Sequence, residues 1–524
     1  MMRYNVYRYL IVVVVLFGFN SCDSLLDVPP QGKLTFDEFW QSNDQAVATI
    51  AGIYSNLGST YHDFKSGNMS AKAISPVESY IYWGELRGEI LAVNPGKFGS
   101  EHLAKENVDY MNIAAIDVTT KFTAFYKIIN EANLAIKYIP TIKDKDPAFL
   151  QEMEDHLMGE AYFLRAYAYF WLVRTFKEVP LVLVPSESDE QDYNLPKSQT
   201  VDIYAQIVSD LEIAKQTLPV WYENDQYSRC RATQYTAMTV LADVYLTMAS
   251  VLQNEVEKMN WYDEVIRNCD EVIASRKYNL VPGIEYGNIF LNGNTEESIL
   301  ETYSNSKVNN QVNNLYDWFT SKGYFMASNS ADELFSAEVL HDYRGSTPPK
   351  GPYPAAGSEV GYASSSRYIN KYKNNTKDAR WIFYRFPEVL LMKAEALAHR
   401  YPDDVNKLAE ACGLINQIRL RAYGVMDYPK TEATTSYEMD NIILDERGKE
   451  FIGEGKRWFE LVRFASRNNF ANKELLLDRV TNAFSGVDQL VIGPRISNPE
   501  SWYLPLNADA LAANINLVQN PYYQ

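Results

Sequence analysis

The sequence has little cysteine or histidine and lacks the short motifs of common catalytic sites. Only four cysteines and five histidines occur in 524 residues, and Cys230, Cys269 and Cys412 are widely spaced. Neither a disulfide framework nor a zinc cluster is indicated. There is no HExxH, GxSxG or GxGxxG, and GEGK at 453–456 lacks the flanking residues of a phosphate loop. We therefore expect no catalytic residues, no metal and no cofactor.

Positive charge is also scarce. The 49 lysines and arginines are outnumbered by 67 acidic residues, which gives a formal net charge of -18. An acidic surface repels phosphate backbones, so we expect no nucleic-acid partner. The hydrophobic content of 46% is enough to fill a core, and the 38 tyrosines are unusually many. Tyrosine offers an apolar ring and a polar tip, which suits both packing and wet binding surfaces.

The N-terminal hydrophobic run, Leu10–Phe19, is too short to span a membrane, which takes about 20 apolar residues. Two arginines precede it, as in a secretory signal peptide, which we place at 1–21. Cys22 then resembles the lipidation site of bacterial lipoproteins, although it could instead be an incidental cysteine behind an ordinary signal. The proline-bearing segment 22–36 reads as a tether between this anchor and the folded body.

Apolar residues at helical spacing dominate the rest of the chain. The segment 161–176 is apolar around most of its circumference, which predicts a helix buried between neighbours. Small alanines facing large aromatics recur along the chain and resemble tetratricopeptide helix pairs. We expect a mostly α, superhelical scaffold of such pairs with minor β, forming one domain over 22–524. The predicted helices are 45–57, 122–139, 161–176, 201–218, 232–252, 261–275, 380–400 and 405–423, followed by one long helix that contains 444–464.

The stretch LDERGKEFIGEGKRWFELVRF contains many charged residues and could form either a catalytic site or a structural ion network. On one helix, Glu446, Glu450 and Glu454 would share a single row, and they would repel one another unless arginines from elsewhere reach them. A glycosidase would instead need two carboxylates facing each other across a cleft. We therefore predict a structural ion network of Glu446, Arg447, Glu450, Glu454 and Arg457. The candidate arginines from elsewhere are Arg165, Arg380 and Arg385.

Four blocks of the chain resemble the SusD/RagB family of outer-membrane nutrient-binding lipoproteins. They are ERGKEFIGEGKRWFELVRF, AYFLRAYAYFWLVRTFKEVPLV, RFPEVLLMKAEAL and the closing YLPLNADALAANINLVQNPYY, in which Pro521 and Tyr522 lack the family's intervening glycine. The resemblance implies a lipid-anchored binding protein at the outer membrane, facing outward. It also implies delivery of oligosaccharides or peptides to a SusC-like TonB-dependent β-barrel.

The family motifs mark scaffold, so the choice of ligand-binding residues rests on physical argument. Two long irregular regions, 61–112 and 283–375, form the expected ligand face, because functional residues favour loops held by a rigid scaffold. Aromatic rings there could stack on sugars, although packing against the helices is the alternative for each of them. The candidates are Tyr82, Trp83, Arg87, Tyr303, Asn305, Tyr316, Trp318 and Tyr324.

Four functions remain open on the sequence. The first is a surface protein that binds glycans, and the second is the same architecture selecting basic or neutral peptides. A glycan hydrolase is the third, and it lacks a recognisable carboxylate pair. The fourth is a scaffold that binds only its barrel partner.

Overall fold

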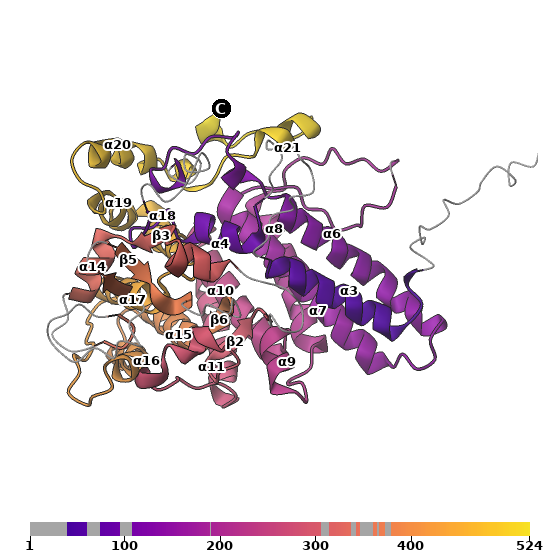
Figure 1. Ribbon diagram of the computed structural model, residues 1–524, viewed down its shortest axis with the longest axis horizontal. Coiled ribbons are helices and arrows are strands. Elements are labelled where there is room, and N and C mark those ends of the chain that lie inside the picture. Colours follow the sequence, from indigo (N-terminus) through magenta and orange to yellow (C-terminus); the bar gives the residue numbers. More distant parts are fainter. Residues whose placement is uncertain are drawn as a thin grey trace, which may run out of the picture.

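The computed structural model describes residues 39–59, 74–94, 107–188, 190–304, 314–336, 342–345, 360–363, 366–372 and 379–524. The signal peptide, Cys22, the tether and Asn305 lie outside these ranges. The described residues form a row of packed helices with a thin layer of short strands along one side (Figure 1). None of the helices in these ranges is long and apolar enough to cross a membrane.

The row of helices begins at the N-terminal end, where α3 packs on α6 and α6 on α7. α7 packs on α8, α8 on α10, α10 on α11, α11 on α15, and α15 on α16. This succession of paired helices confirms the predicted mostly α scaffold. The bounds are α3 Asn43–Leu57, α6 Thr123–Tyr138, α7 Gln151–Phe176, α8 Thr200–Thr217, α10 Gln234–Val251, α11 Lys258–Ala274, α15 Phe386–Arg400 and α16 Val405–Tyr423.

The helix α7 lies at the centre of this row, and its sequence explains why. Seventeen of its 26 residues are buried, on every side of the helix. Its alanines Ala161 and Ala168 are fully buried, and its aromatics pack against rings of other elements, as Trp171 does on Tyr80 at 4.2 Å between centroids. The predicted burial of this segment is confirmed.

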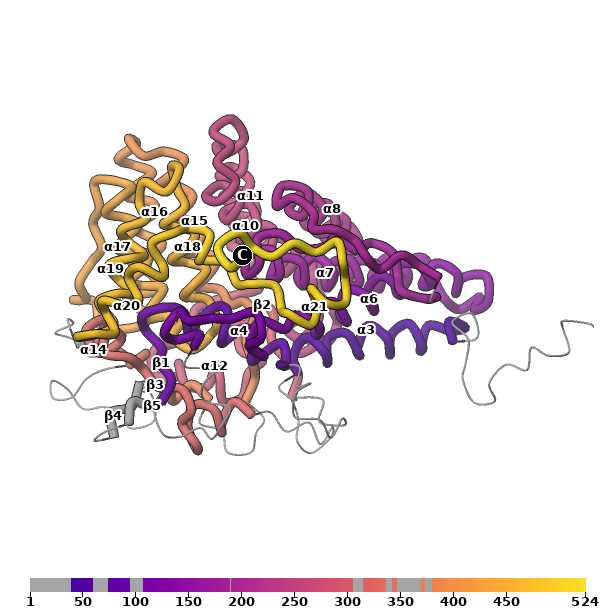
Figure 2. Tube along the Cα trace, turned by 90° about the horizontal axis from the view of Figure 1, so that it is seen from above, coloured from indigo at the N-terminus to yellow at the C-terminus, as the bar shows by residue number. Residues whose placement is uncertain are grey.

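The described residues contain three short two-stranded sheets, and the strands β1 and β3 lie on the side of the molecule that faces downward in Figure 2. We call the strands together with the described parts of 283–375 the loop face. All three pairs are antiparallel. The pairs are β1 Leu91–Val93 with β3 Phe325–Ala327, β2 Ser298–Glu301 with β6 Ile382–Arg385, and β4 Val360–Ala363 with β5 Ser366–Ile369.

One predicted helix was wrong at its start. The segment 380–400 begins with the buried strand β6, and α15 starts only at Phe386, with Pro387 in its first turn. Proline fits that position because its missing N–H would be unpaired there in any case. The hydrophobic pattern of IFYR is equally compatible with strand and helix, so periodicity alone could not separate them.

The predicted long C-terminal helix is also wrong, because it breaks into α17 Ser436–Phe451 and α18 Arg457–Phe470. Gly453 and Gly455 form the break with φ of 80° and 74°, a region that favours glycine. Two further helices, α19 Lys473–Asn482 and α20 Val487–Ile496, follow α18.

The break meets the helix α4, Pro76–Gly84, which is buried at every residue. The backbones touch so closely that a Cβ on Gly84 would lie 1.9 Å from the carbonyl oxygen of Gly455. Glu85 then accepts hydrogen bonds from the backbone N–H groups of Gly453 at 2.8 Å and Lys456 at 3.0 Å. The predicted irregular region 61–112 therefore contains a core helix.

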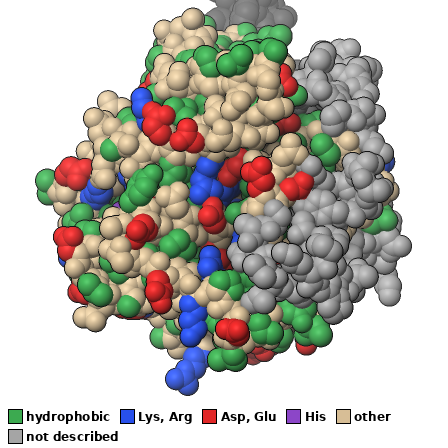
Figure 3. All heavy atoms as spheres, turned by 90° about the vertical axis from the view of Figure 1, so that its left-hand side faces the viewer, with side chains coloured by type: hydrophobic (Ala, Val, Ile, Leu, Met, Phe, Trp, Pro, Cys, Tyr) green, Lys and Arg blue, Asp and Glu red, His purple; other side chains and the backbone are tan. Residues whose placement is uncertain are grey.

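The remaining helices are short and cover the edges of the row. Figure 3 shows the end formed by the C-terminal half, where acidic and basic side chains are interspersed with apolar ones over the described surface. No large field of one sign appears among the coloured atoms of that view. The short helices used below are α9 Asp225–Cys230, α12 Asn288–Leu291, α14 Asn329–Ser336 and α21 Ala508–Ala513.

Candidate functional site

The charged stretch at the end of α17 forms a buried ion network. Arg385, at the end of β6, lies at its centre and is fully buried. Its guanidinium reaches Glu297 at 2.8 Å and Glu454 at 2.9 Å, and it also pairs with Glu450. Each guanidinium hydrogen bond to a carboxylate is charge-assisted, so three acids converge on one planar cation.

The other members of the predicted network are held in the same way. Arg344 reaches Glu446 at 2.5 Å and Glu450 at 3.1 Å. Arg447 reaches Glu460 at 2.6 Å, and Arg457 reaches Glu89 at 3.0 Å. Arg344 and Glu89 come from segments far away in the sequence, so the network joins distant parts of the chain.

Only one of the three external arginines proposed from the sequence lies in the network. Arg385 enters the network, but Arg165 pairs with Asp210 on α8 at 2.8 Å, and Arg380 pairs with Glu301 on β2. Three other arginines, Arg344, Arg419 and Arg421, reach the glutamates of the network instead. They come from segments whose packing against α17 cannot be predicted from residue spacing in the sequence.

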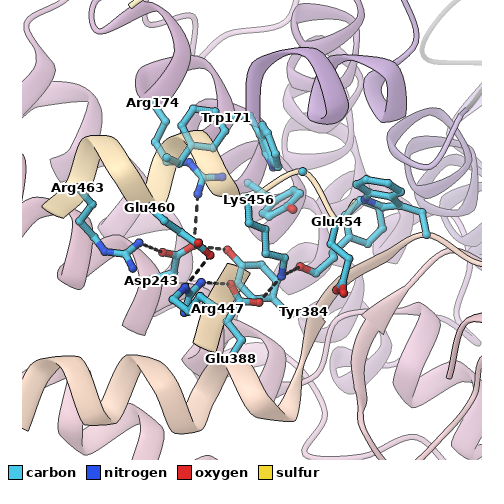
Figure 4. A pocket seen from close by; sticks show the side chains of 15 residues that line it. Trp171, Arg174, Asp243, Tyr384, Glu388, Arg447, Glu454, Lys456, Glu460 and Arg463 are labelled. Carbon is cyan, nitrogen blue, oxygen red and sulfur yellow. Dashed lines mark hydrogen bonds and ion pairs between the residues drawn. The ribbon is translucent and has the colours of Figure 1, made fainter. Parts of the chain in front are cut away.

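A small cavity beside the network is lined by as many cations as carboxylates (Figure 4). It holds about 20 Å³, which is room for about one water molecule. Asp243 lies near Arg174 and Arg463, and Glu460 binds Arg447. This cavity is too small to admit a sugar, and its carboxylates are paired with guanidinium groups. The charged stretch 444–464 therefore belongs to a structural ion network rather than to a catalytic site.

The cations of the network set the ionisation of its acids. Burial alone would raise the pKa of Glu450, but Arg421, Arg385 and Arg344 outweigh it and hold the pKa well below its usual range. Burial also opposes ionisation of Glu454 and Glu446, and there too the neighbouring cations lower the pKa. These carboxylates are thus kept ionised in the folded protein.

Acid should therefore destabilise the fold. A carboxyl with a lowered folded pKa contributes stability above its unfolded pKa, about 4.3 for glutamate, and loses it as the pH falls toward the folded value. We expect the free energy of unfolding, measured by urea titration, to fall steadily below about pH 4.5. Equal values at pH 7 and pH 3.5 would contradict the assignment of these three glutamates.

The first group of predicted ligand residues lies in the core, which corrects that prediction. Tyr82 is 2% exposed, Trp83 1% and Arg87 2%. The Trp83 indole N–H donates to the Thr119 carbonyl at 2.7 Å, and Arg87 donates to backbone carbonyls of Ser501 and Trp502. A ring enclosed in this way has no face left for a ligand, so these three residues are assigned to packing.

The second group of predicted ligand residues lies on the loop face with mixed exposure. Tyr303, just after β2, is 40% exposed, whereas Trp318 is 7% exposed. Tyr316 and Tyr324 are half-buried. The guanidinium of Arg380 lies 5.5 Å from the centre of the Tyr303 ring, which holds an aromatic face and a cation side by side. Of the predicted residues that the structure describes, Tyr303 is the ring most available to a ligand.

The comparisons with known proteins follow this geometry. The model of the SusD family matches residues 246–523, which is more than half of the chain.

The chain belongs to the SusD family.

A second family model, described as starch-binding and associating with the outer membrane, matches residues 72–246 of this SusD-family chain. SusD-like protein P38 of Formosa agariphila is 25% identical over 506 residues, covering 86% of this chain and 90% of that protein. SusD-like protein P2 of the same organism is 25% identical over 560 residues, covering 97% and 98%. These matches associate the chain with glycan-binding nutrient uptake at the outer membrane.

Solved structures agree on the fold. A SusD superfamily protein of Bacteroides thetaiotaomicron matches with a TM-score of 0.70 and 18% identity, over 93% of this chain and 99% of that one. The B. fragilis protein NanU matches with a TM-score of 0.68 and 19% identity, over 95% and 100%. The helix row and the loop face are therefore the SusD fold.

Proposed function

We propose that this SusD-family chain captures oligosaccharides at the cell surface and delivers them to a SusC-like TonB-dependent β-barrel. Cys22 carries the lipid anchor, and 22–36 is the tether that joins the anchor to the body. The observation that carries the proposal is the match of residues 72–523 to the SusD and starch-binding family models. The chain binds and does not cut, since its densest acidic cluster is enclosed and paired with arginines.

Tyr303 with Arg380 is the proposed centre of the ligand site on the loop face. The exposed ring can stack on the C–H face of a sugar. The guanidinium of Arg380 is only 8% exposed, is held by Glu301 and the Cys230 sulfur at 3.7 Å, and lies 5.5 Å from the ring centre, so it positions the ring from behind. A ring held in this way loses less freedom on binding than a free side chain.

Replacement of Tyr303 with alanine tests this site. We expect the affinity for a bound oligosaccharide to fall about tenfold or more, which corresponds to about 1.4 kcal/mol, because the stacking face is removed. The measurement is isothermal titration calorimetry with the best glycan from an array. Tyr437→Ala is the matched control, because Tyr437 is 58% exposed on α17. Equal affinities in the two variants would place the ligand elsewhere.

Peptide capture is the second candidate, and the acidic balance of the chain favours it for basic peptides. A peptide array beside the glycan array separates the two ligand classes. Detection of shortened products after incubation with a glycan would support the hydrolase hypothesis instead. Co-purification with a β-barrel, with no small ligand found in either screen, would support the hypothesis of a scaffold that binds only its β-barrel partner.

A further inference from the structure

A second and larger cavity opens at the surface, away from the ion network. It has a volume of about 640 Å³, inside the range of about 300–1,000 Å³ for ligand pockets. It is bounded by the first turns of α7, the end of α8, the connection 218–223 and the start of α10. The short helix α9 follows this connection and lies low in Figure 1.

The lining of this cavity mixes two rings with planar polar groups. Trp221 and Tyr222 supply the ring surface, and both are half-buried. The indole N–H of Trp221 donates to Asp225 at 2.7 Å, and Arg229 lies 5.5 Å from the ring centre, so the ring is fixed before any ligand arrives. The polar lining is Glu152, Asp155, His156, Gln216, Thr217, Glu223 and Gln234.

The chemistry of this lining suits an uncharged polyhydroxyl ligand. Carboxylates and amides accept from hydroxyl groups in their own plane, and the amides also donate. Glu152, Asp155 and Glu223 contribute three carboxyl groups, while no lysine or arginine from the described ranges is among the lining residues. These three carboxyl groups repel acidic sugars, while the cations Arg229, Lys277 and Arg231 lie against the two rings and are not themselves lining residues. Neutral sugars meet no such barrier.

The cavity is close to the proposed ligand site through α9. Arg229 of α9 contacts Trp221 and donates to the Ser298 carbonyl of β2 at 2.7 Å, while the next residue, Cys230, contacts Arg380. Two places suited to sugars thus lie on either side of one short helix. Neither Tyr303 nor Arg380 is among the lining residues of the cavity, so each place can be altered by its own substitution.

We propose that this cavity is a second binding site for neutral oligosaccharides, distinct from the Tyr303 site. The proposal rests on the proposed function, since it assigns the same ligand class to a new place. It predicts that one protein molecule binds two short neutral oligosaccharides, and that uronate-bearing or sulfated oligosaccharides do not enter the cavity.

The test blocks the cavity with a bulky side chain. Gln216 is exposed at the end of α8, so Gln216→Trp fills the cavity without disturbing the core. Ser209→Trp is the matched control, because Ser209 is exposed two turns earlier on the same helix and does not line the cavity. Calorimetric titration with the best neutral array ligand measures the stoichiometry and affinity of each variant.

We expect two sites per molecule in the wild type and in Ser209→Trp, and one in Gln216→Trp. Tyr303→Ala should retain the cavity and lose the other site. A single site that Tyr303→Ala abolishes and Gln216→Trp leaves intact would overturn the second site and keep the proposed function. A wild type that binds no neutral glycan would overturn both. Binding of spermine in the cavity, with neutral sugars excluded, would overturn the assigned ligand class.

Discussion

Replacing Arg385 with methionine should lower the free energy of unfolding by about 3–5 kcal/mol, the largest effect we expect from a single change. The substitution removes one cation from among Glu297, Glu450 and Glu454, all of which are buried. Methionine fills much of the volume, so the loss comes from three buried acids that each lose one cationic partner rather than from a void. Urea titration at pH 7 measures the change.

The matched control is Arg267→Met. Arg267 pairs with Glu264 one turn earlier on α11, but its side chain is 55% exposed. An exposed pair of this kind contributes about 0–1 kcal/mol, because water already solvates both charges. A loss below about 1 kcal/mol in Arg385→Met, similar to that in Arg267→Met, would show that the network does not support the fold.

The second large effect should come from Trp83→Ala, which we expect to cost about 3–5 kcal/mol through the cavity it leaves. The indole packs 5.0 Å from the Phe125 ring and 5.3 Å from the Phe176 ring between centroids, and its N–H is bonded to Thr119. The affinity of the folded variant for oligosaccharide should stay within about twofold of the wild type, because the ring does not reach the surface.

Trp83→Phe keeps most of the apolar volume and should recover much of the lost stability. Tyr437→Ala, on the exposed face of α17, should change stability by less than about 0.5 kcal/mol. A Trp83→Ala protein that unfolds like the wild type but no longer binds glycan would reverse our assignment and return Trp83 to the ligand site.

Much of the fold could be predicted from the sequence, because apolar residues recur at helical spacing wherever a helix buries one or more of its faces. α8 and α16 lie within two residues of the predicted bounds. α7 was found by its all-round apolar surface, though it begins ten residues earlier than expected. That first part, QEMEDHLMGE, is mostly polar and carries no all-round apolar pattern, since only the later turns of α7 are enclosed by neighbouring helices.

The candidate site could be predicted only in part, because exposure depends on how distant segments pack. SYIYWGELRGE has the composition of a binding loop, yet α4 is sealed between α18 and the central helices. Nothing within those eleven letters distinguishes a buried aromatic from an exposed one. The network was predicted because three glutamates placed on one helical row would require external cations. In the structure Glu454 lies in the break after α17, and the identity of the cations depends on tertiary contacts.

The cavity beside α9 left no signal in the sequence. Its lining comes from three separate segments, and neither Trp221 nor Gln216 belongs to a motif. Each segment alone reads as a helix end or a connection. These side chains line one cavity only after α7, α8 and α10 have packed together.

The meeting of α4 with the turn before α18 constrains the order in which the molecule can form. Glu85 and Gly453 are separated by 368 positions, yet their hydrogen bond lies at a backbone contact that admits no extra atom. Although Trp83 already finds partners in α6 and α7, the contacts of Glu85 can form only after residues 453–456 have been made. This junction therefore closes late in synthesis, and a contact of such long sequence separation slows folding, because the intervening chain must be ordered first.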